Sequence, residues 1–171
     1  MAELDDQTQS AETHFRRGIR LALDWGKARV GVAACDADGL LCYPVETVPC
    51  GVLGSQQHSQ ALRRVNQLCD EYEPLELVLG WPVDLRGAAG PAVDYLMQIA
   101  AQLQELTQLP IRCVDERMTT AQASRQLAAS GKSARQRKSI IDQAAAIGIL
   151  EQAIEQERRT GQPAGRLFAA E

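Results

Sequence analysis

Two apolar runs of strand length lie near the start of the chain, and a turn of four residues joins them. The first run is Ile19 to Asp24, the second is Arg29 to Cys35, and Trp25-Gly26-Lys27-Ala28 separates them. A connection this short holds the two strands side by side and antiparallel, so the sheet must begin with a hairpin. Because aspartate has low strand propensity, Asp24 needs either a hydrogen-bonded turn or a metal ion where it ends the first strand.

After a third strand-like run over residues 40–43, helical and strand-like patterns alternate. Helices are predicted over 56–72, 91–107, 119–129 and 139–158, strands over 75–80 and 111–114, a proline-marked loop over 44–54 and a basic linker over 132–138. A helix that connects two strands makes them parallel. We therefore expect an α/β fold, a mixed five-stranded sheet with helices on both faces, over residues 18–158. Residues 1–17 are expected to be a disordered tail and 159–171 a solvated tail.

Composition narrows the class of protein. The chain of 171 residues suffices for one core, and its apolar runs fall far short of a membrane span. The acidic N-terminus lacks the basic and apolar parts of a signal peptide, so a cytoplasmic location is expected. The five cysteines are scattered, as is typical of buried thiols. With His14 and His58 predicted to be surface residues, a zinc site of His and Cys ligands is not expected.

Carboxylates follow the ends of strands that should be neighbours. Asp24 ends the first strand, Asp115 and Glu116 follow strand 111–114, and Asp142 lies near the start of the last helix. Sites in such sheets gather beyond the carboxyl ends of parallel strands. A cluster of oxygen ligands suits Mg²⁺ or Mn²⁺, and two such ions can support phosphodiester cleavage.

Each carboxylate also has a purely structural interpretation. Asp24 could be an ordinary turn residue, and Asp115 or Glu116 could pair with Arg117 or cap the next helix. Asp142 could complete a capping box with Ser139.

Basic residues are concentrated in one segment. Between Arg117 and Ile141 there are six basic residues and no acid, although the net charge of the chain is −4. Such a segment is either a solvated linker or a surface that binds phosphates. The expected nucleic-acid contacts are Lys27, Arg29, Arg117, Thr119, Thr120, Arg125, Lys132, Arg135, Arg137 and Lys138.

Four motifs occur in a characteristic order: Asp24-Trp25-Gly26 with Arg29-Val30-Gly31, Gly80-Trp81-Pro82 to Gly90-Pro91, Asp115-Glu116-Arg117-Met118-Thr119-Thr120, and Lys138 to Asp142-Gln143-Ala144-Ala145. Together they resemble the YqgF family over residues 19–155. The resemblance implies a ribonuclease H-like fold related to Holliday junction resolvases. It also implies a metal-dependent nuclease that matures the 5′ end of pre-16S ribosomal RNA, with Asp24, Glu116 and Asp142 at the acidic positions. Trp25 and Trp81 depart from the family's usual residues, and base stacking is one explanation.

Other functions remain open at this stage. The protein could resolve branched DNA, or it could be a non-catalytic partner in RNA processing or transcription. The hairpin with Asp24, Gly26 and Gly31 also resembles that of sugar kinases and actin-like ATPases, but the chain is too short for their second half. The expected partner is structured RNA or branched DNA rather than a membrane. A monomer would suffice for an RNA end, whereas a symmetric junction requires a homodimer.

Overall fold

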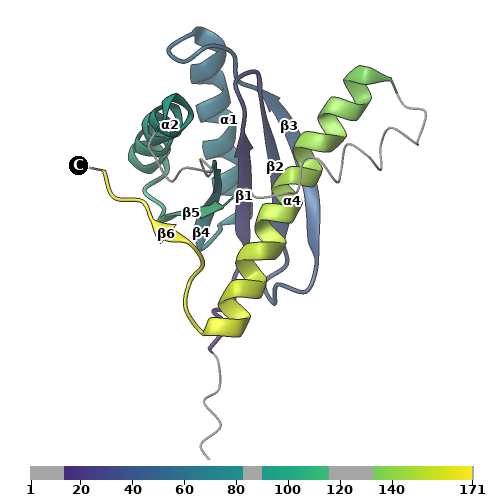
Figure 1. Ribbon diagram of the computed structural model, residues 1–171, viewed down its shortest axis with the longest axis vertical. Coiled ribbons are helices and arrows are strands. Elements are labelled where there is room, and N and C mark those ends of the chain that lie inside the picture. Colours follow the sequence, from purple (N-terminus) through teal and green to yellow (C-terminus); the bar gives the residue numbers. More distant parts are fainter. Residues whose placement is uncertain (1–13, 83–89, 116–132, 171) are drawn as a thin grey trace, which may run out of the picture.

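The computed structural model describes residues 14–82, 90–115 and 133–170, apart from the side chains of Arg135 and Arg137. The elements along the chain (Figure 1) are β1 (Arg20–Trp25), β2 (Arg29–Cys35), β3 (Cys42–Pro49), α1 (Gln56–Tyr72), β4 (Glu76–Trp81), α2 (Pro91–Thr107), β5 (Ile111–Asp115), α4 (Ala134–Thr160) and β6 (Arg166–Leu167). The helix predicted over 119–129 lies outside the described residues.

The strands form one mixed sheet in the order β3-β2-β1-β4-β5-β6. β1 pairs antiparallel with β2 and parallel with β4, and β4 pairs parallel with β5, as the short turn and the helical crossovers predicted. The sheet has six strands rather than the expected five. The additional strand is β6, which pairs antiparallel with β5 although its residues were expected to be a solvated tail.

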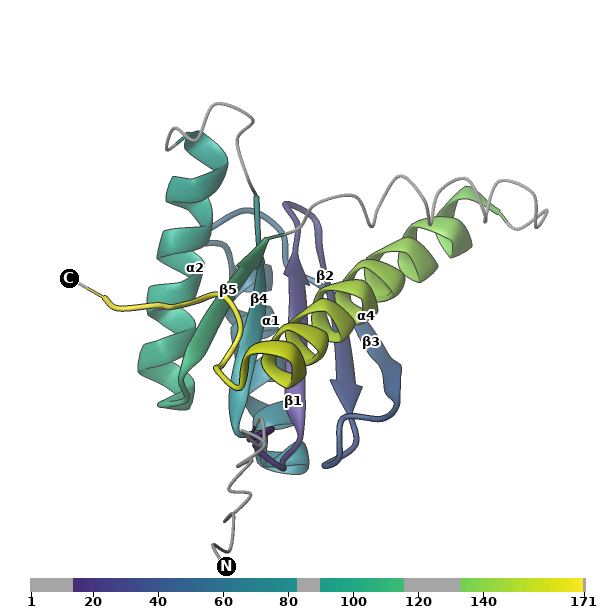
Figure 2. The same ribbon diagram turned by 60° about the horizontal axis from the view of Figure 1, so that its bottom comes forward.

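Helices cover both faces of the sheet, as predicted (Figure 2). α1 and α2 lie on one face and α4 crosses the other. Successive residues of a strand point to opposite faces. In β1, Leu21, Leu23 and Trp25 join the core under α1 and α2, whereas Ala22 joins the core under α4. Asp24 has the same parity as Ala22, so it lies on the α4 face.

The start of the described chain is more tightly packed than predicted. Arg16 donates to Glu157 at 2.8 Å and to Glu76 at 2.9 Å, and Arg20 donates to Glu157 at 2.9 Å. Arg20 and Glu157 are almost fully buried, at 1% and 2% exposure. Arg16, which was predicted to lie outside the domain, therefore joins an otherwise buried ion-pair network between β1, β4 and α4.

Three local predictions are wrong. β3 extends through Pro44 and Pro49, which were assigned to a loop, because an edge strand tolerates proline. His58 is buried rather than exposed, and its Nε2 lies 2.7 Å from Gln102 Oε1. α4 begins at Ala134 behind a capping box of Ser133 and Gln136, so the expected basic linker is partly helical.

None of the described helices is long and apolar enough to cross a membrane.

Candidate active site

Asp24 lies in a row of residues that runs across three strands. Asp24 of β1 pairs with Gly31 of β2, and Gly31 pairs with Thr47 of β3. Neighbouring strands lie about 4.8 Å apart, so the row is compact. Because Asp24 belongs to β1 itself, the alternative of an ordinary turn aspartate does not apply.

α4 rests directly on the middle of this row. A Cβ atom built at Gly31 would lie 2.0 Å from the carbonyl oxygen of Asp142, and real Cβ contacts are essentially never shorter than 3.0 Å. Only glycine therefore allows the helix backbone to approach β2 this closely. The contact places Asp142 over the strand next to Asp24, so the two carboxylates share one face of the sheet.

Thr47 fixes the helix on both sides of Asp142. Its Oγ1 donates to the carbonyl oxygen of Ser139 at 3.2 Å, and it accepts from Ser139 Oγ and Gln143 Nε2, both at 3.1 Å. Ser139 and Gln143 are four residues apart and thus lie on one side of α4. The hydrogen bonds hold the turn that carries Asp142.

Arg29 holds the Asp142 side chain. The Arg29 Nε donates to Asp142 Oδ2 at 2.6 Å, a charge-assisted hydrogen bond between side chains that are 37% and 19% exposed. The alternative in which Asp142 caps the helix is excluded, because the N-cap is Ser133, nine residues earlier in the chain. Arg29 was predicted to contact nucleic acid, and in the structure its guanidinium reaches the candidate site.

Asp115 lies at the carboxyl end of β5, opposite Trp81 of β4. It has the same parity as Ile111 and Cys113, which belong to the core under α1 and α2. Asp115 is also the last residue of β5, and it lines a cavity together with Gln152 and Gln156 of α4, so parity alone does not assign it to either face of the sheet. Glu116 lies outside the described residues. Within 14–82, 90–115 and 133–170, no three His, Cys, Asp or Glu side chains are arranged to hold a metal ion.

The predicted nucleic-acid contacts are only partly described. Lys27 is exposed in the turn after β1, and Lys138 is exposed in the first turns of α4. The backbones of Arg135 and Arg137 also belong to α4. The predicted contacts Arg117, Thr119, Thr120, Arg125 and Lys132 lie outside the described residues.

Three contributors to the site did not emerge from the sequence: Thr47, Ser139 and Gln143 as anchors of α4. The glycine inside strand β2 was a usable signal, since such a glycine often marks close backbone approach. The suggestion of base stacking finds no support at Trp25, which is 5% exposed and packs edge-on against His58 with ring centroids 6.0 Å apart. Trp81 is also buried, at 9% exposure.

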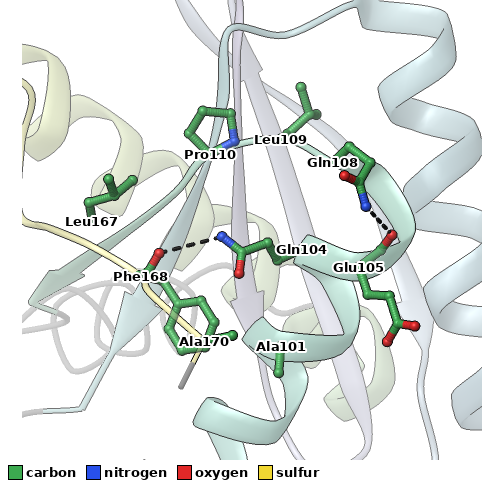
Figure 3. A pocket seen from close by; sticks show the side chains of 9 residues that line it. All are labelled: Ala101, Gln104, Glu105, Gln108, Leu109, Pro110, Leu167, Phe168 and Ala170. Atoms are coloured by element: carbon green, nitrogen blue, oxygen red, sulfur yellow. Dashed lines mark hydrogen bonds between the residues drawn. The ribbon is translucent and has the colours of Figure 1, made fainter.

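The larger described cavity lies elsewhere (Figure 3). Its volume is about 660 Å³, and it is lined by the C-terminal half of α2, by residues 108–110 and by Leu167, Phe168 and Ala170. Within this cavity, Gln104 Nε2 donates a hydrogen bond to the carbonyl oxygen of Phe168 at 3.5 Å. Because Pro110 precedes β5, this cavity is at the opposite end of that strand from Asp115.

Comparisons with known proteins identify the fold and the family of the chain. The fold is similar to that of Thermus thermophilus RuvC in complex with a Holliday junction substrate, with a TM-score of 0.55 and 14% identity over 86% of this chain and 99% of that one. A family described as "RuvX: Holliday junction resolvase" matches residues 18–156.

Curated relatives are far more similar in sequence. A "Putative pre-16S rRNA nuclease" of Streptomyces coelicolor is 47% identical over 94% of this chain and 93% of its own length. A protein of the same name from Streptomyces avermitilis is 50% identical over 88% of this chain and 94% of its own length.

Proposed function

Because the chain belongs to the RuvX family, we propose that it is a metal-dependent nuclease that matures the 5′ end of the precursor of 16S ribosomal RNA. The family match confirms the resemblance to YqgF proteins that the four sequence motifs indicated. The relatives named as pre-16S rRNA nucleases cover nearly the whole chain, which supports the substrate.

The observation that carries the proposal is the seating of α4 on Gly31. It brings Asp142 next to Asp24 on one face of the sheet, where ordinary packing gives no reason to place two carboxylates. Two adjacent carboxylates repel each other unless cations lie between or beside them. The Arg29 guanidinium supplies one such charge in the structure.

The donor set fits Mg²⁺ or Mn²⁺. Asp24 and Asp142 offer only oxygen ligands, which these ions prefer. Glu116 completes the proposed ligand set, because it stands at the third acidic position of the family's motifs. A divalent ion held there would supply an activated water and would stabilise the charge that develops on the phosphate.

The remaining residues position the groups that react. Arg29 and the Thr47 hydrogen bonds hold Asp142 in one orientation. Lys27, Lys138 and the other basic residues of 117–138 would contact phosphates of the substrate, and these contacts give salt-dependent binding with little sequence information.

Branched DNA is the second candidate substrate. The family description names Holliday junction resolvases, and the fold is similar to that of RuvC. Cleavage of a symmetric junction would require two copies of the site in a two-fold dimer.

Cleavage of two labelled substrates tests the proposal. A precursor rRNA fragment and a four-way DNA junction are incubated with Mg²⁺ or Mn²⁺ and with wild type, Asp24→Asn, or the control Asp70→Asn. Asp70 is an exposed carboxylate on α1, on the other side of the sheet. Loss of a direct ligand should exceed the roughly 10- to 100-fold effect typical of its supporting residues.

We expect the wild type and Asp70→Asn to cleave the RNA, and Asp24→Asn to lose at least about 100-fold of the rate. Cleavage of the junction alone would move the function to recombination. Absence of metal-dependent cleavage of either substrate would contradict a nuclease function.

A further inference from the structure

A smaller cavity opens beside Asp115, at the end of the sheet where the predicted site lies. Its volume is about 320 Å³, within the range of small-molecule sites, and it is lined by Asp115 and Val114 of β5, Gln152 and Gln156 of α4, and Gly165 and Arg166. Three separate parts of the chain therefore contribute polar groups to one concave surface. Neither the sequence motifs nor the proposed catalytic groups account for Gln152, Gln156 or Arg166.

The segment that carries Arg166 is held in a defined position. A Cβ atom at Gly165 would lie 2.1 Å from the carbonyl oxygen of Cys113, and the φ of Gly165 is +63°. Only glycine can therefore bring the chain this close to β5. Ala164 is buried at 3% exposure, and Arg166 pairs with Cys113 across the two strands. Arg166 is consequently fixed at the rim of the cavity rather than carried by a free tail.

The lining has the chemistry of a nucleotide site. Gln152 and Gln156 are four residues apart on one side of α4, and each amide can both donate and accept. Arg166 offers up to five N–H donors and suits phosphate. Burial raises the pKa of the Cys113 thiol to about 11, so Cys113 adds no negative charge at neutral pH. Asp115 is the one acidic residue that the described part of the chain contributes to the lining, so the phosphate is assigned to the Arg166 side of the cavity.

The cavity is also close enough to serve the same substrate as the carboxylates. Gln152 follows Asp142 by ten residues, or roughly 15 Å along α4. A strand bound at Asp24 and Asp142 would thus reach the cavity within a few nucleotides.

We propose that this cavity binds one nucleotide of the RNA substrate a short distance from the cleaved bond, with Arg166 on its phosphate and Gln152 and Gln156 on its base or ribose. The inference rests on the proposed function, because it takes RNA as the ligand. It adds a subsite that sets where along the RNA the cut falls.

A length series of RNA oligonucleotides tests the subsite. Fluorescence anisotropy measures the affinity of labelled RNAs shortened one nucleotide at a time, with Asp24→Asn as the background so that the RNA stays intact. The variants are Arg166→Ala and the pair Gln152→Ala with Gln156→Ala. The matched control is Arg63→Ala, which removes an exposed arginine from α1 on the opposite face. Thermal unfolding verifies that each variant is folded.

In the background protein, one shortening step should weaken binding by about tenfold, as expected when a charge-assisted contact is lost. In Arg166→Ala the longer RNA should already bind about tenfold more weakly than it binds the background protein. Removal of the same nucleotide should then cause no further loss of affinity. The slope of log affinity against log salt concentration should fall by about 0.7, the value for one phosphate on a single strand. Arg63→Ala should match the background in all respects.

Identical length series and salt slopes for Arg166→Ala and the background would overturn the subsite. Cleavage by the wild type separates the two proposals. If the wild type cleaves RNA but Arg166→Ala binds like the control, the subsite alone fails. If no cleavage occurs but the Arg166-dependent step is present, the nuclease proposal fails and the nucleotide site stands.

Discussion

Substitution of Gly31 by alanine tests the contact on which the site depends. The new methyl group would lie 2.0 Å from the carbonyl oxygen of Asp142, and the obstacle is helix backbone rather than a flexible side chain. α4 must therefore retreat by at least about 1 Å, a displacement that can cost about 100-fold in catalysis when it separates reacting groups. Overpacking of this kind also costs about 1–3 kcal/mol of unfolding free energy.

The assay compares kcat for RNA cleavage and the urea unfolding midpoint of the wild type, Gly31→Ala and Gly90→Ala. Gly90 is a suitable control because a Cβ atom there meets nothing within 4 Å, and it precedes α2 on the other face. We expect Gly31→Ala to lose far more activity than its loss of stability explains, and Gly90→Ala to remain active. Wild-type kcat and stability in Gly31→Ala would refute the argument that α4 is seated on this residue.

Three further substitutions probe the groups around α4. Thr47→Val removes the hydrogen bonds to α4, so kcat should fall with little change in KM, and chemical denaturation should show a loss of about 1–2 kcal/mol. Arg29→Ala should lower kcat by about 10- to 100-fold in single-turnover cleavage, and Arg29→Lys should restore the charge but not the orientation of Asp142. Glu157→Gln removes the closer of the two carboxylates that the described residues pair with the buried Arg20 and leaves Glu76, at 3.6 Å, which should cost up to about 3–5 kcal/mol at pH 7. Burial raises the pKa of Glu157, but the hydrogen bond from Arg16 and the charge of Arg20 lower it by more. The net pKa of Glu157 therefore lies below its usual range. The stabilisation is thus complete above pH 4.5 and lost as pH falls through the folded pKa, and denaturation against pH should show this loss in the wild type only.

The sequence predicted those parts of the fold that local rules determine. The four-residue turn after Asp24 required the hairpin of β1 and β2, and Pro91 stands at the first turn of α2 as expected. The apolar spacing of α1 predicted its bounds, Gln56–Tyr72, without error. The helical crossovers then determined that β1, β4 and β5 are parallel.

The sequence did not reveal features that depend on distant contacts. β6 has only two residues, too few for a periodic pattern, and forms because Gly165 allows the chain to approach β5. His58 is buried because its ring packs against Trp25 of β1 and hydrogen-bonds to Gln102 of α2, and its own neighbours in sequence indicate neither contact. Arg29 and Asp142 are 113 residues apart, so their pairing depends on the crossing of α4 over β2.

The candidate site follows the same division. Asp24 and Asp142 could be selected from strand ends and motif order, whereas the contacts of Thr47 and Arg29 that orient Asp142 depend on tertiary packing. The choice between Asp115 and Glu116 illustrates the limit of sequence reasoning. The two carboxylates are adjacent in sequence and only Asp115 lies among the described residues, so Glu116 is proposed as the ligand on the family motif alone.

The most direct test of the central claim is a calorimetric titration of the protein with Mn²⁺. Wild type, Asp24→Asn, Asp142→Asn and the control Asp70→Asn are titrated under identical conditions without nucleic acid. If Asp24 and Asp142 hold one divalent ion, each of their variants should bind Mn²⁺ at least about tenfold more weakly than the wild type, and Asp70→Asn should bind like the wild type. Equal affinity in all four proteins would contradict a metal site built from these two carboxylates.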